Sequence, residues 1–308
     1  MNKRRAGIIL LFFLLFACGV CYISYKIYND LAQIRSERFL LEERRKAFRE
    51  LETRIENEKG QFAGQAGIVV KDLRTGWECV LNRDVSFPSA SLAKIPVMAV
   101  CFYAAEKDGL DLEEKIRLKP ADRVAGSGVL KGSPVGTELT ILRLIELMIA
   151  ESDNTAANML IDRLGFDYIK RTIPRLGLRH TNVDRHMMDF KKRKEGVENY
   201  STAGDIEFLL DSIYHGRLIN KKISDLCMSF LKKQKLRDRI PALLPSDTVV
   251  AHKTGLERGI CHDAGILFLP QGDMLISVLT RHKDTTSRRA KRFIARTALI
   301  AYTYCQNN

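Results

Sequence analysis

Three short polar motifs, far apart in the chain, combine the residue types that serine acyl transfer requires. Residues 91–94 read Ser-Leu-Ala-Lys, residues 152–154 read Ser-Asp-Asn, and residues 253–255 read Lys-Thr-Gly. A Ser-x-x-Lys pattern alone arises by chance about once in a chain of this length. All three motifs in this order are improbable as a coincidence of composition. We therefore predict that they form one site, at which a serine hydroxyl becomes acylated.

Ser91 and Lys94 are the candidate nucleophile and its base. A serine hydroxyl attacks poorly unless a nearby group takes its proton, and a lysine can take it only if burial or neighbours lower its pKa. Residues three apart share one face of a helix, and Pro88 is well placed to open one. The apolar stretch 93–105 equally suits an ordinary core helix that carries a chance serine and lysine. The first motif alone does not separate these two interpretations.

Strand patterns at both ends of one domain indicate the scaffold that must position the motifs. Residues 66–72 and 77–81 are rich in strand-forming residues and are separated by a turn, which predicts a hairpin. Residues 249–253, 264–269 and 274–280 also have strand patterns. With helices between them, these segments predict an α+β fold. Its terminal strands meet in one antiparallel sheet flanked by helices, and an all-helical subdomain completes it.

Helix patterns lie on both sides of the second motif. Thr140 can cap a helix that runs to about Ala150 with its apolar residues facing inward. The second motif interrupts this helix, and another is expected over residues 155–164. Further helices are expected over residues 202–215 and, with a basic surface, over residues 288–304. The second motif therefore sits at a helix–helix junction.

The N-terminal segment predicts a membrane anchor. Residues 6–25 hold no charged side chain, and three basic residues precede them. About 20 apolar residues span a bilayer core as a helix. The alternatives are a cleaved signal peptide or a lipoprotein signal at Cys18, but the apolar stretch is long and continues past Cys18, so we favour an uncleaved anchor. Residues 1–25 are expected to be a transmembrane helix with the N-terminus inside.

Residues 26–60 are predicted to form a charged helical stalk that leads to a domain over residues 61–308. Apolar residues recur at seven-residue spacing from Ile27 to Ile55, but the second apolar position of the heptad is mostly charged. The stalk is therefore either a weak coiled coil, which would allow weak self-association, or a single solvated helix.

The balance of charge is strongly basic. The 308 residues carry a formal net charge of +13, with basic clusters at residues 191–194, 232–235 and 288–296. Such charge favours anionic lipid surfaces or anionic wall polymers, although it also occurs on plain solvated surfaces. Nucleic acid is not expected as a partner, because no aromatic platform or known binding motif accompanies the charge.

Neither the cysteines nor the histidines form a metal-binding pattern. Two of the seven cysteines lie in the predicted anchor, and those in the domain are scattered, so we expect small buried apolar side chains. The six histidines form no helical zinc motif. No metal and no cofactor is expected.

With the motifs placed, residues 66–308 resemble the class A β-lactamase family and its relatives among penicillin-recognising serine enzymes. The resemblance is carried by residues 87–94, by residues 152–158, and by residues 253–255 with the strand segment 262–265. It implies a β-lactamase/transpeptidase-like fold. It also implies a small substrate, either a β-lactam or a peptide of the D-Ala-D-Ala type.

The resemblance implies catalytic roles for three side chains. Ser91 attacks a carbonyl and becomes acylated, Lys94 accepts its proton, and Ser152 relays a proton to the leaving nitrogen. The positions implied to bind substrate are Asn154, Lys253, Thr254, Gly255 and Leu256.

Within that set, the implied tasks differ. Asn154 orients Lys94 and the substrate amide, and Lys253 with Thr254 holds the substrate carboxylate. The backbone N–H groups of Ser91 and Leu256 are implied to form the oxyanion hole, where each donor is typically worth about 2.7–4 kcal/mol of transition-state stabilisation.

One position departs from the family's pattern. Efficient hydrolases of this family carry a glutamate that activates the deacylating water, on a loop that here begins near residues 183–185. The matching position is Met187, and a methionine cannot act as a base. Asp189, Glu195 or Glu198 could substitute if the loop is shifted, so the deacylation base is left unassigned.

The residues implied for acylation are all present, whereas the base implied for deacylation is not, and three functions are consistent with this. The first is a membrane-anchored serine acyl-hydrolase that forms an acyl-enzyme through Ser91 with β-lactams and hydrolyses them slowly, and this is our prediction. The second is a D,D-peptidase-like enzyme that acts on peptidoglycan stem peptides. The third is a β-lactam-binding sensor that stays acylated. In each case the domain is expected outside the cytoplasm, where such substrates lie.

Overall fold

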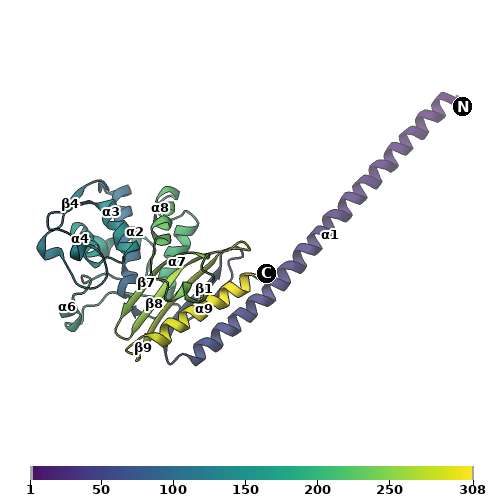
Figure 1. Ribbon diagram of the computed structural model, residues 1–308. Coiled ribbons are helices and arrows are strands. Elements are labelled where there is room, and N and C mark those ends of the chain that lie inside the picture. Colours follow the sequence, from purple (N-terminus) through teal and green to yellow (C-terminus); the bar gives the residue numbers. More distant parts are fainter. Residues whose placement is uncertain (1–2, 307–308) are drawn as a thin grey trace. The chain divides into compact units, whose positions relative to one another are not determined.

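The computed structural model describes the backbone of residues 3–306, and the side chains of residues 15–306 (Figure 1). The chain divides into two compact units, residues up to Glu50 and residues from Leu51 on. This division falls inside helix α1 (Lys3–Gln61), ahead of the domain start at residue 61 predicted from the sequence. The candidate site lies in the second unit.

The predicted anchor and stalk both fall in α1. The side chains of residues 8–14, in the middle of the predicted anchor, lie outside the described residues. Among the residues that are described, no helix is long and apolar enough to cross a membrane. The transmembrane anchor therefore stays a prediction, as does self-association through the stalk.

A five-stranded antiparallel sheet forms the centre of the second unit. Its strand order is β2-β1-β9-β8-β7. The N-terminal strand β1 pairs with β9 near the C-terminus, so that Ile68 lies opposite Val278. The predicted hairpin and the three predicted C-terminal strands are confirmed. The strands of this sheet are β1 (Gly64–Asp72), β2 (Glu78–Leu81), β7 (Val249–Glu257), β8 (Ile260–Phe268) and β9 (Met274–His282).

Helices cover both faces of this sheet (Figure 1). Helices α7 (Ala203–Tyr214) and α8 (Lys221–Lys232) pack on one face, and α9 (Arg288–Gln306) packs on the other. Strand β8 is accordingly buried along almost its whole length, and its two polar residues, His262 and Asp263, are buried with the apolar ones.

A helical subdomain stands beside the sheet and carries the second motif, which confirms the predicted α+β architecture. Its helices are α2 (Lys94–Lys107), α3 (Ile141–Ala150), α4 (Asn154–Leu164), α5 (Phe166–Arg175) and α6 (Phe190–Lys194). Two pairs of short strands border it, β3 (Phe87–Pro88) with β6 (Tyr200–Ser201) and β4 (Lys115–Arg117) with β5 (Glu138–Thr140).

The predicted helix starts are confirmed by their caps. The side chain of Thr140 accepts a hydrogen bond from the backbone N–H of Arg143, and that of Thr202 accepts one from Asp205. Helices α5 and α8 were not predicted. The first begins immediately after Gly165 and contains Pro174, and the second carries its lysines at its two ends, but both have an amphipathic pattern from which they could have been predicted.

Candidate active site

Ser91 lies on a tight turn between the five-stranded sheet and the helical subdomain. The turn is a short 3-10 helix, η1 (Ala90–Ala93), and α2 begins only at Lys94. Pro88 does not open the helix as we predicted. It lies in the short strand β3, opposite Tyr200. The backbone of Ala90 has φ +46°, a left-handed conformation that costs a non-glycine residue roughly 1–2 kcal/mol, and it turns the chain so that Ser91 faces the sheet edge.

The side-chain nitrogen of Lys94 contacts residues of both the first and the second motif. Lys94 is fully buried, and its Nζ lies 3.2 Å from Ser91 Oγ. The same nitrogen donates to the carbonyl oxygen of Ser152 at 2.5 Å and to Oδ1 of Asn154 at 2.7 Å, and it lies 3.2 Å from Ser152 Oγ. The first and second motifs therefore meet at one atom.

The second motif forms the tight connection between α3 and α4. Ser152 is buried with φ +54°, and Asp153 caps α4 by accepting from the N–H of Ala156. The other carboxylate oxygen of Asp153 accepts from the N–H groups of Val129 and Leu130 at 2.6 and 2.8 Å. This carboxylate therefore holds the loop and the motif together, and Ser152 is fixed between them.

Strand β7 brings the third motif to the same place. The Nζ of Lys253, also fully buried, donates to Ser152 Oγ at 2.9 Å and to the carbonyl of Thr254 at 3.0 Å. A Cβ at Gly255 would lie 3.3 Å from the carbonyl oxygen of Ser89, so a side chain there would press on the segment that leads into Ser91. Leu256, next along the strand, is exposed.

The two lysines have strongly altered acidity. Burial lowers the pKa of Lys94 well below its usual value, and the neighbouring charge of Lys253 lowers it further. Burial, with the charge of Arg239, lowers the pKa of Lys253 to about 7. The charge of Lys253, which shares Ser152 Oγ with Lys94, thus favours the neutral amine of Lys94.

Buried polar groups behind the site position it, and the motifs did not reveal them. His262 on β8 lies 2.8 Å from the carbonyl of Pro88 through Nε2 and accepts from the N–H of Thr280 through Nδ1. Burial lowers the pKa of His262 to about 4, so the ring is neutral at neutral pH. It links β8 to the segment that precedes Ser91.

A second buried pair supports β7. The ring nitrogen Nδ1 of His252 lies 2.9 Å from the carboxylate of Asp263, which also accepts from the N–H of Ile240. Arg239, next to Ile240, is almost fully buried and adds positive charge near Lys253. The sequence did not indicate that Arg239 is buried near the site, because an arginine in a polar loop is normally a surface residue.

Met187 lies on the loop that was expected to supply the deacylating carboxylate. Its backbone N–H donates to Oδ1 of Asn158 at 2.7 Å, and Nδ2 of Asn158 donates back to its carbonyl at 3.1 Å. The side chain is 6% exposed and packs in the hydrophobic core. Asn158 belongs to α4, which begins at the second motif, so these two hydrogen bonds fix the position of the loop relative to that motif.

The three carboxylates that could replace the glutamate are engaged elsewhere. Asp189 caps α6, Glu195 pairs with Lys192 at the surface, and Glu198 is buried against Arg185 and Arg193. Within residues 15–306, none of the three hydrogen-bonds to Ser91, Lys94 or Ser152.

Comparison with known proteins shows the family of the chain. Residues 50–305 match the model of a family described as the β-lactamase enzyme family. The chain belongs to this family. It is a serine hydrolase of the β-lactamase type.

Curated β-lactamases align with most of the chain. β-Lactamase VEB-1 of Pseudomonas aeruginosa is 27% identical over 274 residues, which cover 83% of this chain and 91% of that protein. A β-lactamase of Streptomyces albus G is 26% identical, covering 81% of this chain and 82% of that protein.

Solved structures share the fold. The β-lactamase from Sphaerobacter thermophilus superposes with a TM-score of 0.75 at 28% identity, and the match covers 84% of this chain and 97% of that one. A leucine-to-glutamate variant of PBP-A, solved as its acyl-enzyme complex with penicillin G, superposes with a TM-score of 0.76 at 25% identity and the same coverage. This β-lactamase-family enzyme therefore has the fold of class A β-lactamases.

Proposed function

We propose that this enzyme opens β-lactams through an acyl-enzyme on Ser91 and releases the product slowly. The observation that carries the proposal is the position of Lys94 Nζ, within hydrogen-bonding distance of Ser91 Oγ, Ser152 Oγ and Asn154 Oδ1. A buried lysine whose pKa is lowered, beside a serine on a strained turn, is the arrangement that nucleophilic catalysis requires.

Acylation uses the neutral amine of Lys94. Ser91 Oγ attacks the lactam carbonyl carbon while its proton passes to Lys94 Nζ. The carbon–nitrogen bond of the ring then breaks, and the ring nitrogen takes a proton from Ser152 Oγ. Ser152 Oγ lies 3.2 Å from Lys94 Nζ and 2.9 Å from Lys253 Nζ, so the protonated Lys94 returns the proton to Ser152 while Lys253 holds that hydroxyl in place. One proton thus moves from Ser91 to the leaving nitrogen.

Substrate binding uses the edge of the sheet. The ammonium of Lys253 and the hydroxyl of Thr254 attract the substrate carboxylate, and the charge of buried Arg239 reinforces that attraction. The N–H groups of Ser91 and Leu256 receive the developing oxyanion.

Deacylation lacks a dedicated base. Met187 offers no proton acceptor, and the nearby carboxylates are bound to other partners. Lys94 is neutral again once the proton from Ser91 has passed through Ser152, and it is then left as the group that activates water, although its nitrogen is already hydrogen-bonded to Ser152 and Asn154. The acyl-enzyme is therefore long-lived.

The N-terminal segment supports an extracytoplasmic enzyme held at the membrane. Residues 6–25 are uncharged and follow three basic residues, and β-lactams and wall peptides are encountered outside the cytoplasm. Alkaline extraction of membranes, with protease treatment of intact and lysed spheroplasts, tests this. We expect the chain to stay in the membrane pellet and the domain to be cleaved in intact spheroplasts. A protected domain would contradict the proposed location.

The test of the proposed reaction combines adduct mass with turnover. We expect wild-type chain incubated with a penicillin to gain one acyl adduct, and a chromogenic cephalosporin to show a stoichiometric burst followed by slow turnover. Ser91→Ala must lose the adduct, while Ser89→Ala, which removes only a hydroxyl bonded to the carbonyl of Asn199, must keep it.

Other outcomes separate the alternatives. Fast multiple turnover contradicts slow deacylation, and no turnover after the burst indicates the sensor. Release of D-Ala from a stem-peptide mimic at a rate above cephalosporin turnover indicates the D,D-peptidase. Absence of any adduct on the wild-type chain overturns the proposal.

A further inference from the structure

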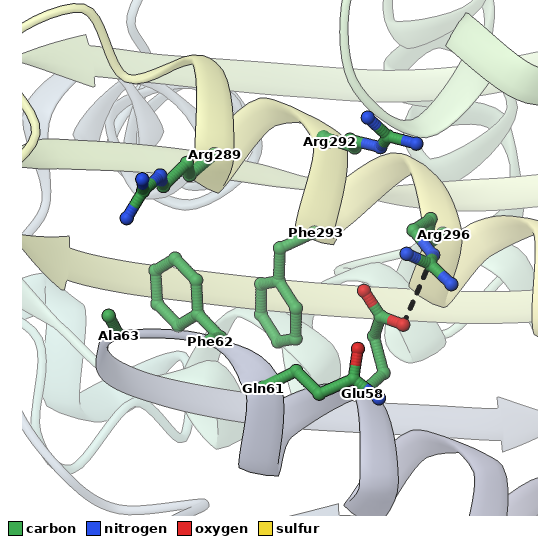
Figure 2. A pocket seen from close by; sticks show the side chains of 8 residues that line it. All are labelled: Glu58, Gln61, Phe62, Ala63, Arg289, Arg292, Phe293 and Arg296. Carbon is green, nitrogen blue, oxygen red and sulfur yellow. Dashed lines mark ion pairs between the residues drawn. The ribbon is translucent and has the colours of Figure 1, made fainter.

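A second hollow lies between the end of α1 and α9, and it is lined by residues that take no part in the Ser91 site. Its volume is about 220 Å³. The lining residues are Glu58, Gln61, Phe62, Ala63, Arg289, Arg292, Phe293 and Arg296. The three arginines all belong to α9, and Figure 2 shows Arg289 and Arg296 on either side of the rings of Phe62 and Phe293, with Arg292 pointing away from the rings. The hollow is smaller than the roughly 300–1,000 Å³ of pockets for drug-sized ligands, so it suits a small anion or one end group of a larger molecule.

The charges that line the hollow are unbalanced. Glu58 pairs with Arg296 at 3.1 Å (Figure 2). Among the described residues, the side chains of Arg289 and Arg292 have no carboxylate partner. Three arginines against one glutamate leave two exposed guanidinium groups available to a ligand.

Two stacked aromatic rings form the floor of the hollow, and the N-terminus of α9 lies at one end of it. The rings of Phe62 and Phe293 stack with their centroids 4.5 Å apart and an angle of 10° between their planes. Both rings are largely buried, so the floor is fixed. Arg289 is the second residue of the 19-residue helix α9, whose N-terminus carries positive partial charge. The carboxylate of Asp284 accepts from the backbone N–H of Arg289 at 3.3 Å and offsets part of that charge, so the guanidinium groups rather than the helix end attract an anion.

We propose that this hollow binds a phosphate monoester group or inorganic phosphate. Guanidinium groups form charge-assisted hydrogen bonds with phosphate oxygens. A phosphate monoester carries about −1.5 to −2 charges at neutral pH, which matches the two unpaired arginines better than a single carboxylate does. The ligand is either a free phosphate or the headgroup of a phosphatidic acid, and both present the same group.

The test measures binding to the purified full-length chain by titration calorimetry at low ionic strength. The probes are inorganic phosphate and a short-chain phosphatidic acid below its micellar concentration. We expect saturable binding that weakens about tenfold or more in Arg289→Gln/Arg292→Gln, because two charge-assisted contacts are lost. Glu58→Gln releases Arg296 and is expected to tighten binding.

The matched control removes the same charge elsewhere. Arg171→Gln/Arg175→Gln changes two exposed arginines of α5 and is expected to bind as wild type does. All variants should melt at the wild-type temperature and keep the Ser91 adduct. Stronger binding of inorganic phosphate identifies a free-phosphate site, and stronger binding of phosphatidic acid identifies a lipid site. No saturable binding of either probe, or an equal loss in the control, overturns the proposal.

Discussion

The guanidinium of Arg193 lies 2.6 Å from the carboxylate of Glu257, and this contact joins the loop that carries Met187 to the strand that carries Lys253. Arg185 reaches the same carboxylate at 3.4 Å, and both arginines pair with the buried Glu198. Two arginines and two glutamates thus form a clamp beside the candidate active site. The loop position is set by the sheet edge rather than by the loop alone.

Removing the charge of Glu257 should loosen that loop. We expect Glu257→Gln to lower the free energy of unfolding by about 1.5 kcal/mol, at the low end for hydrogen bonds between charged groups because the pair is partly exposed. Amide hydrogen exchange over residues 184–199 should rise. Glu195→Gln, on an exposed pair in the same loop, should change stability by no more than about 0.5 kcal/mol. Equal effects of the two variants would show that the clamp does not restrain the loop.

Introducing a carboxylate at Met187 should speed deacylation. The backbone of this position is held by Asn158 of α4, so a glutamate there would start from a fixed point beside the second motif. A positioned general base typically accelerates a reaction by at least about 100-fold. We expect the penicillin adduct of Met187→Glu to decay faster than that of the wild type by a factor of this order. The decay is measured by intact mass. Met187→Gln, of the same shape without the charge, should decay as wild type does. An unchanged adduct lifetime in folded Met187→Glu would place the missing base elsewhere.

The two lysines predict the pH dependence of acylation. Lys94 must be neutral to accept the proton of Ser91, so acylation rises with pH through the lowered pKa of Lys94. Lys253 must be charged to attract a carboxylate, so acylation falls as pH rises through about 7. In Lys253→Arg, the cation persists to higher pH and the falling limb should disappear from the profile of adduct formation. A falling limb near pH 7 in folded Lys253→Arg would assign it to another group.

Gly128 should be intolerant of any side chain. Its φ is +115°, and a Cβ there would lie 2.3 Å from the carboxylate carbon of Asp153 and 2.6 Å from its Cα. We expect Gly128→Ala to lower the free energy of unfolding by at least about 3 kcal/mol and to impair adduct formation, because Asp153 holds Ser152 in place. Gly136 has φ +87° with open space around it, so Gly136→Ala should cost only about 1 kcal/mol of strain. Similar melting temperatures for the two variants would mean that the contact with Asp153 is unimportant.

Local features of the chain were sufficient to predict most elements of the domain. The caps at Thr140 and Thr202 and the strand patterns at both ends depend on residues a few positions apart. The pairing of Ser91 with Lys94 is equally local. The sequence therefore predicted a serine acyl-transfer site on an α+β scaffold, and it indicated that Met187 stands where a base is expected.

The tertiary structure alone decided how the cluster is assembled. Lys94 meets Ser152 and Lys253 only because α2, the α3–α4 turn and β7 pack together, and no local pattern records that packing. The same holds for Arg239, whose burial near Lys253 has no sequence signature. Side chains far apart in the chain acquire their lowered pKa values from burial and from each other's charge, and both exist only once the chain is folded.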